Sequence, residues 1–104
     1  MDNALTHENF TNYLNTTFQV ELDTEAIPLS LTEISAVRAT ESQEQFSIIF
    51  RGPLDHALPQ GIHRFRHDQM GEFDLFIVPI KRGAEAYQYE AVFNRLAARD
   101  QPTS

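Results

Sequence analysis

The sequence predicts a mainly β fold, which we expect to be a small antiparallel barrel or a strongly curved sandwich of about six strands with one N-terminal helix. Apolar residues recur at every second position in several segments, and this is the period of a strand. Short connections containing glycine, proline or polar residues join these segments, and no strand–helix–strand rhythm is present. At 104 residues, the chain is expected to form one domain over residues 1–104.

Residues 5–15 predict a short amphipathic helix. Thr6 is a suitable N-cap, and Glu8 lies in the first turn, where the helix dipole favours a negative charge. Phe10, Tyr13 and Leu14 form an apolar stripe. A helix of about three turns is marginal alone, so we expect the stripe to dock on the sheet.

Three strands are expected in the first half of the chain. Residues 17–22 alternate cleanly, residues 23–28 are interpreted as a connection, and residues 29–37 predict a strand with a bulge near Thr32–Glu33. Residues 38–45 are polar and turn-like. Phe46, Ile48 and Phe50 then form the inward row of a third strand, which Gly52-Pro53 should end.

Residues 71–95 predict a β-hairpin with its turn near Gly83. The expected register has three cross-strand pairs: Phe73 with Phe93, Leu75 with Ala91 and Ile77 with Tyr89. Gly71 and Gly83 should need a positive φ, and Pro79 should lie at a bulge or on an edge. Residues 100–104 are expected to be a polar tail.

Residues 62–67 predict the strand before this hairpin. If it pairs with the strand that follows Gly71, one register satisfies three pairs: Phe65 with Phe73, Arg64 with Asp74 and Arg66 with Glu72. The two charged pairs would form a ladder on the outer face of the sheet, where they help to set the register.

Composition excludes several classes of function. Fifteen acidic and eight basic residues give a net charge of −7, which opposes binding to nucleic acid or to an anionic membrane. Cysteine is absent, so disulfides and thiolate metal sites are excluded. No long apolar run and no signal-peptide pattern are present. We expect a location in the cytoplasm, or in a larger structure assembled without a signal peptide.

The histidines invite a metal interpretation that their spacing opposes. His63 and His67 would lie roughly 13 Å apart along a strand, too far to share one ion. His7-Glu8 lacks the second histidine of a zinc-protease helix. Nucleotide-binding and nucleophile-elbow motifs are also missing. We therefore expect no metal, no cofactor and no enzymatic activity.

Four polar residues near strand ends are candidates for a ligand site: Arg51, Gln60, Asn94 and Arg95. The favoured interpretation is structural, with the arginines paired to buried carboxylates or loop carbonyls and Asn94 bonded to backbone groups. The alternative is that these residues converge at one mouth of the barrel and bind an anion or a carboxylate.

The chain has more apolar residues in its predicted strands than one core needs. Strand parity places five apolar side chains on the face opposite the inward rows: Ile49, Phe76, Val78, Ile80 and Val92. The helix can cover only part of this face. The rest predicts an interface with another protein or with a second copy, such as a homodimer.

Four motifs resemble those of a bacterial domain family of unknown function: F-R-G-P at residues 50–53, L-P-Q-G at 58–61, L-F-x-V-P at 75–79 and Y-x-A-V-F-N-R at 89–95. The resemblance covers nearly the whole chain from Phe10 onward. It implies no particular activity, because the family has no established one. It does imply an association with phage-tail-collar-like or tail-fibre-like proteins, and hence an assembly or adhesin context.

These observations favour a non-enzymatic protein-interaction or assembly module, and the resemblance implies that it serves a phage-tail-like or fibre-like bacterial structure. The alternative is a small-ligand-binding β-barrel, and an enzyme is the least favoured class. A cavity distinguishes the first two, because a ligand binder needs a pocket with converging polar groups, whereas an interior filled by phenylalanine rings leaves none.

Overall fold

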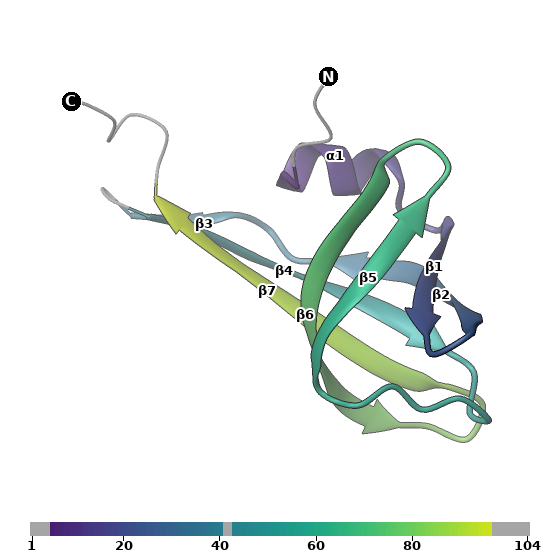
Figure 1. Cartoon of the computed structure of the whole chain (residues 1–104). Helices are drawn as coiled ribbons and strands as arrows, with labels where there is room; N and C mark the ends of the chain where they lie inside the picture. Colours follow the sequence, from purple (N-terminus) through teal and green to yellow (C-terminus); the bar gives the residue numbers. More distant parts are fainter. Residues whose placement is uncertain (1–4, 41–42, 97–104) are drawn as a thin grey trace.

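A computed structural model describes residues 5–40 and 43–96. In chain order, its elements are α1 (His7–Asn12), β1 (Thr17–Leu22), β2 (Glu25–Ile34), β3 (Arg38–Ala39), β4 (Gln43–Gly52), β5 (Gly61–His67), β6 (Gly71–Arg82) and β7 (Tyr87–Leu96) (Figure 1). The predicted class is confirmed: the protein is mostly strand, and its six longer strands close into an antiparallel barrel with one short N-terminal helix.

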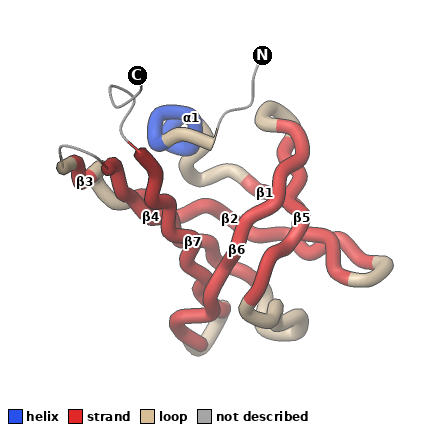
Figure 2. Tube along the Cα trace, turned by 60° about the vertical axis from the view of Figure 1, so that its left-hand side comes forward, coloured by secondary structure: helices blue, strands red, loops and turns tan. Residues whose placement is uncertain are grey.

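Closure of the barrel depends on one strand pairing. The order β2-β1-β5-β6-β7-β4 is closed by pairing of β2 with β4, and the short β3 is added to β4. β6 changes its pairing partner along its length: Gly71 to Ile77 pair with β5, whereas Val78 to Arg82 pair with β7. The first half of β6 and the second half of β7 therefore diverge, and α1 lies over the opening between them (Figures 1 and 2).

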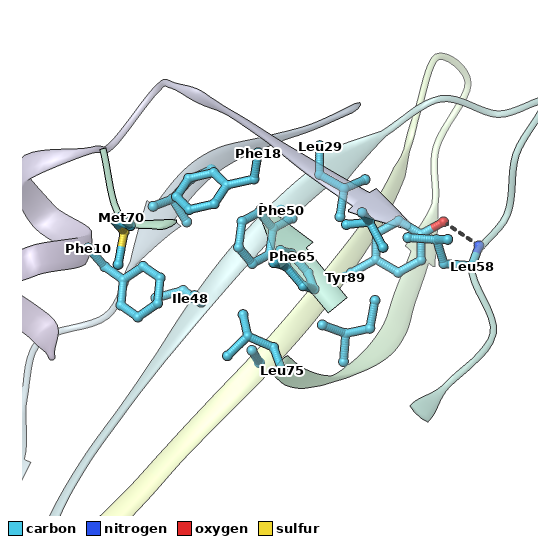
Figure 3. Packing of buried hydrophobic residues seen from close by; sticks show 14 of the residues in the cluster. Phe10, Phe18, Leu29, Ile48, Phe50, Leu58, Phe65, Met70, Leu75 and Tyr89 are labelled. Atoms are coloured by element: carbon cyan, nitrogen blue, oxygen red, sulfur yellow. Dashed lines mark hydrogen bonds between the residues drawn. The ribbon is translucent and has the colours of Figure 1, made fainter. Parts of the chain in front are cut away.

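The inward rows of the strands fill the barrel with apolar side chains. Phe18, Phe50 and Phe65 are fully buried and pack in one continuous cluster with aliphatic residues of several strands (Figure 3). Phe10 extends this cluster from α1, with its ring centroid 5.4 Å from that of Phe93 and 6.2 Å from that of Phe73. The helix is thus held by an aromatic side chain that plugs the opening of the barrel.

Two predicted features of β5 and β6 are confirmed. Phe65 lies opposite Phe73, and the charged pairs Arg64–Asp74 and Arg66–Glu72 follow in the same register. Pro79 lies at a bulge, because the register of β6 against β7 shifts between Pro79 and Lys81. A proline is tolerated there because the irregular ladder does not need its missing N–H.

The predicted register between β6 and β7 is wrong. Tyr89 lies opposite Pro79 rather than Ile77, and the pairing begins only at Val78 and Glu90. The reason is that β6 changes partner partway along, so the inward residues of its first half face β5 and α1. Phe73 and Phe93 consequently pack on Phe10 rather than on each other.

The start of β2 also differs from the prediction, because residues 23–28 are not a connection: the strand begins at Glu25. Asp23 and Thr24 alone join β1 to β2, and Asp23 adopts a positive φ of 56°. Pro28 lies inside the strand opposite Gln19, beyond the part of β2 that pairs with β4. One side of Pro28 is therefore an edge, where a missing N–H costs no ladder bond. The predicted bulge is confirmed, as the register shifts between Leu31 and Glu33.

Other boundaries differ in smaller ways. The helix is capped by Thr6 as expected but ends at Asn12, and the expected turn over residues 38–45 instead contains β3 and the start of β4. Gly71 has the expected positive φ of 81°, whereas Gly83 has none. The predicted tail over residues 100–104 lies outside the described residues.

Candidate functional site

The histidines serve the fold individually in the described structure. The Nε2 atom of His7 lies 2.9 Å from the carbonyl oxygen of Ser35, and that of His63 lies 2.8 Å from the carbonyl oxygen of Pro59. His56 lies 3.4 Å from a carboxylate oxygen of Glu25. Within residues 5–40 and 43–96, no three potential metal ligands from histidine, cysteine, aspartate or glutamate gather at one point.

His67 has the most elaborate set of contacts. Its Nδ1 atom accepts hydrogen bonds from the backbone N–H groups of Gln69 (3.0 Å) and Met70 (3.2 Å), so the ring proton must lie on Nε2. Nε2 donates to the hydroxyl of Thr16 at 3.0 Å, and the ring packs on Phe18 with 4.3 Å between centroids. Burial lowers the pKa of His67, and the opposing influence of the Asp68 carboxylate is weaker. His67 is therefore a neutral structural link between the α1–β1 connection and the β5–β6 turn.

The structure does not gather the four candidate ligand residues at one mouth of the barrel. Arg51 and Asn94 lie at opposite ends of the β4–β7 ladder, because Arg51 pairs with Gln88 and Asn94 with Gln45. Asn94 is six positions beyond Gln88 along β7, a distance of about 20 Å.

The surroundings of these residues are open. Arg51 is exposed and lies 3.4 Å from Glu85, which is still more exposed, rather than pairing with a buried carboxylate. Gln60 is exposed in the β4–β5 connection, and the side chain of Arg95 is outside the described part of the structure. The ligand-binding role of these residues stays a prediction.

The barrel interior offers no polar lining to a ligand in the described residues. Every buried core side chain there is hydrophobic, and the hydroxyl of the buried Tyr89 accepts a hydrogen bond of 2.9 Å from the backbone N–H of Leu58 (Figure 3). No buried side-chain polar atom in this part of the chain lacks a partner. A small-molecule site needs converging polar groups in an enclosed pocket, so the interior does not provide one.

Large apolar side chains instead lie on the outside of the barrel. We call Ile49, Ile62, Phe76, Val78 and Val92 the outer apolar face. Ile62 is 70% exposed, Val92 is 55% exposed and Phe76 is 51% exposed, whereas Ile49 and Val78 are partly buried. Four of these residues were predicted from strand parity. Ile62 was missed, although it lies two positions before Arg64 in the same strand and therefore shares its outward face.

The residues of this face are neighbours on adjacent strands. Ile62 on β5 lies directly opposite Phe76 on β6, and Val78 follows Phe76 on the same side of the strand. Across β7, Glu90 separates Val78 from Ile49 on β4. The outer apolar face thus crosses four strands and contains one carboxylate in its middle. Ile80 is also exposed, but it lies at the irregular end of β6.

Charges beside and within this face differ in whether they are paired. On β1, β5 and β6, the Arg64 guanidinium lies 2.7 Å from Asp74 and 3.2 Å from Glu72, and Arg66 lies 3.3 Å from Glu21. The hydrogen bond to Asp74, and its charge, raise the pKa of Arg64 above the ordinary value. By contrast, neither Glu90 nor Glu33 forms an ion pair with another described residue, and both flank Ile49 across the sheet.

Fold and site together define a small closed antiparallel barrel with a filled interior and an apolar outer face. The chain belongs to a family described as a domain of unknown function (DUF6916), which matches residues 5–93. Comparison with curated proteins and with solved structures found no match. None of the described helices is both long enough and apolar enough to cross a membrane.

Proposed function

We propose that this domain is a non-enzymatic protein-interaction module that binds its partner through the outer apolar face. The observation that carries the proposal is the exposure of Ile62 and Phe76, which pair across β5 and β6, and of Val92 on β7, on the outside of a barrel that has its own buried apolar core. Contiguous apolar groups that are exposed in this way are typical of interaction surfaces.

The interior supports this function over the ligand-binding alternative. Phe18, Phe50 and Phe65 fill the space that a lipocalin-like binder would leave for its ligand. Because the core side chains are apolar and fully packed, recognition by this fold has to use its outer surface or its loops.

The assembly context is part of the same proposal. Membership of a domain family without an assigned activity is compatible with a part that acts by binding, and the motif resemblance suggests a phage-tail-like or fibre-like bacterial structure. We propose that the domain acts in the cytoplasm or within such an assembly, held there by contact of the outer apolar face with another protein or with a second copy.

Replacement of Phe76 by glutamate tests this function. Phe76→Glu places a carboxylate that must be desolvated in the contact, so we expect it to abolish binding while the half-exposed position leaves the fold intact. The readouts are light scattering of the purified protein and affinity capture from the source cell, followed by mass spectrometry.

Thr24→Glu is the matched control, since it adds the same charge at an exposed turn between β1 and β2. The proposal is supported if Phe76→Glu loses an oligomer or a captured protein that wild type and Thr24→Glu retain. It fails if all three proteins show the same mass and the same captured proteins.

A further inference from the structure

The carboxylate at the centre of the outer apolar face points to the chemistry of its partner. We propose that the face binds a protein segment that presents a lysine or arginine side chain flanked by aliphatic side chains. This inference rests on the proposed function and adds to it the charge and the polarity of the partner.

First, Glu90 lies among aliphatic side chains of the outer apolar face. Its cross-strand neighbours are Val78 on one side and Ile49 on the other, and along β7 the next residue on the same side is Val92. A partner that covers these three aliphatic side chains must therefore also cover the carboxylate. An ionised carboxylate that loses water without gaining a cation is strongly unfavourable.

Second, no described residue forms an ion pair with Glu90. Arg64 and Arg66 are committed to Asp74, Glu72 and Glu21, and Arg51 lies beside Glu85. Arg38 lines the same shallow hollow as Glu90, yet the two side chains form no ion pair in the described structure. A cation from the partner would satisfy Glu90, and the charge of Glu33 on the far side of Ile49 would add to the attraction.

Third, the charges of the face distinguish a second copy of this chain from a different partner protein. In a two-fold dimer the same patch meets itself, so Glu90 and Glu33 of one copy would approach those of the other. The chain carries a net charge of −7, and no paired cation within the face relieves that repulsion. Charge complementarity therefore favours a basic and aliphatic partner over self-association.

The apolar part of the partner is set by Ile62 and Phe76. These two side chains lie opposite each other on β5 and β6, and both are more than half exposed. Aliphatic groups on either side of the cation would cover this pair and Val92, which excludes water from the ion pair between them. A cation alone would leave these side chains in water.

Peptide titration followed by ¹H–¹⁵N NMR tests the inference with defined probes. The probes are three short peptides that alternate valine with lysine, valine with glutamate, and serine with lysine. We expect the valine–lysine peptide alone to bind with shift changes centred on the amides of Ile62, Phe76, Val78 and Val92.

Two variants with the same net charge separate the role of Glu90 from general attraction to an acidic protein. Glu90→Gln should weaken binding of the valine–lysine peptide by about tenfold, because it removes the partner of a cation in a mostly apolar contact. Asp55→Asn removes one charge from the exposed β4–β5 connection and should change the affinity by less than about twofold.

Three results would overturn the inference: equal effects of Glu90→Gln and Asp55→Asn, binding of the valine–glutamate peptide at the same face with similar affinity, or no binding at this face by the valine–lysine peptide. The proposed function fails separately, when Phe76→Glu changes neither the oligomer nor the captured proteins. A partner that is lost in Phe76→Glu but kept in Glu90→Gln would leave the function standing and contradict the stated chemistry.

Discussion

His67 and Thr16 are joined by a hydrogen bond of 3.0 Å that links the β5–β6 hairpin to the segment between α1 and β1. The contacts of the other ring nitrogen require a neutral imidazole, because Nδ1 accepts hydrogen bonds from two backbone N–H groups. A protonated ring would turn that acceptor into a donor facing other donors. The fold near α1 therefore depends on the protonation state of one side chain.

Stability should fall when His67 is forced to take up a proton. Its pKa is lowered in the folded protein by burial, whereas the unfolded chain binds the proton near the ordinary value of 6.5. The unfolded state thus holds more protons below that pH, and the free energy of unfolding decreases as the pH falls through the folded pKa. Above about pH 7 the full contribution is present.

Urea denaturation between about pH 7.5 and about pH 5.5 measures this effect. His67→Asn keeps an acceptor for the backbone N–H groups but removes the titration, so its stability should depend less on pH over this range. His56→Asn is the control and should retain the slope of the wild type. An unchanged slope in His67→Asn would contradict the assignment.

Phe50 and Phe76 should respond to truncation in opposite ways. Phe50 is fully buried among Phe18 and Phe65, so Phe50→Ala should cost about 3–5 kcal/mol through lost burial and a residual cavity. Phe76→Ala removes the same atoms from a half-exposed site, where we expect a loss below about 1 kcal/mol. Urea midpoints compare the two variants, and equal losses would mean that Phe76 belongs to the core.

The hydroxyl of Tyr89 should contribute to stability beyond the packing of its ring. Tyr89→Phe leaves the buried N–H of Leu58 without its acceptor, at a cost of about 1–3 kcal/mol. Tyr87→Phe removes a hydroxyl that forms no hydrogen bond with a described residue and should cost less. Thermal unfolding compares the two variants, and a Tyr89→Phe protein as stable as wild type would contradict the role of this bond.

Thr6 should stabilise α1 through its cap. Its hydroxyl oxygen accepts a hydrogen bond of 3.1 Å from the backbone N–H of Asn9, and Thr6→Ala should cost about 0.5–2 kcal/mol. Thr11→Ala removes an exposed hydroxyl that donates to His7 within the helix, which contributes little. Amide exchange at Phe10 reports the difference, and equal protection in both variants would show that the cap is dispensable.

Local patterns predicted several strands, and they predicted the pairing of β5 with β6, which a short connection joins. β1, β4 and β5 show regular alternation, and the pairs Phe65–Phe73 and Arg64–Asp74 follow from a tight connection ending at Gly71. The change of partner along β6 is not visible locally, because it depends on closure of the barrel by β2 and β4 and on the place of Phe10. That is why the expected pairs across β6 and β7 were wrong.

The candidate surface was only partly predictable for a related reason. Strand parity alone placed Phe76, Val78 and Val92 on the outside, because successive side chains of a strand point to opposite faces of the sheet. The position of Glu90 between Val78 and Ile49 needs the register of three strands, which one sequence does not reveal. The alternative in which Arg51 and Asn94 meet at one mouth overlooked that both lie on one long ladder.

Site-specific photo-crosslinking in the source cell tests the central claim most directly. A photoreactive amino acid at position 76 should form covalent adducts with one or a few proteins, because this position is half-exposed within the outer apolar face. The same amino acid at position 24, in the exposed β1–β2 turn, should form none of these adducts. Identical adduct patterns from both positions, or none from position 76, would contradict the account of this barrel as a module that binds protein through that face.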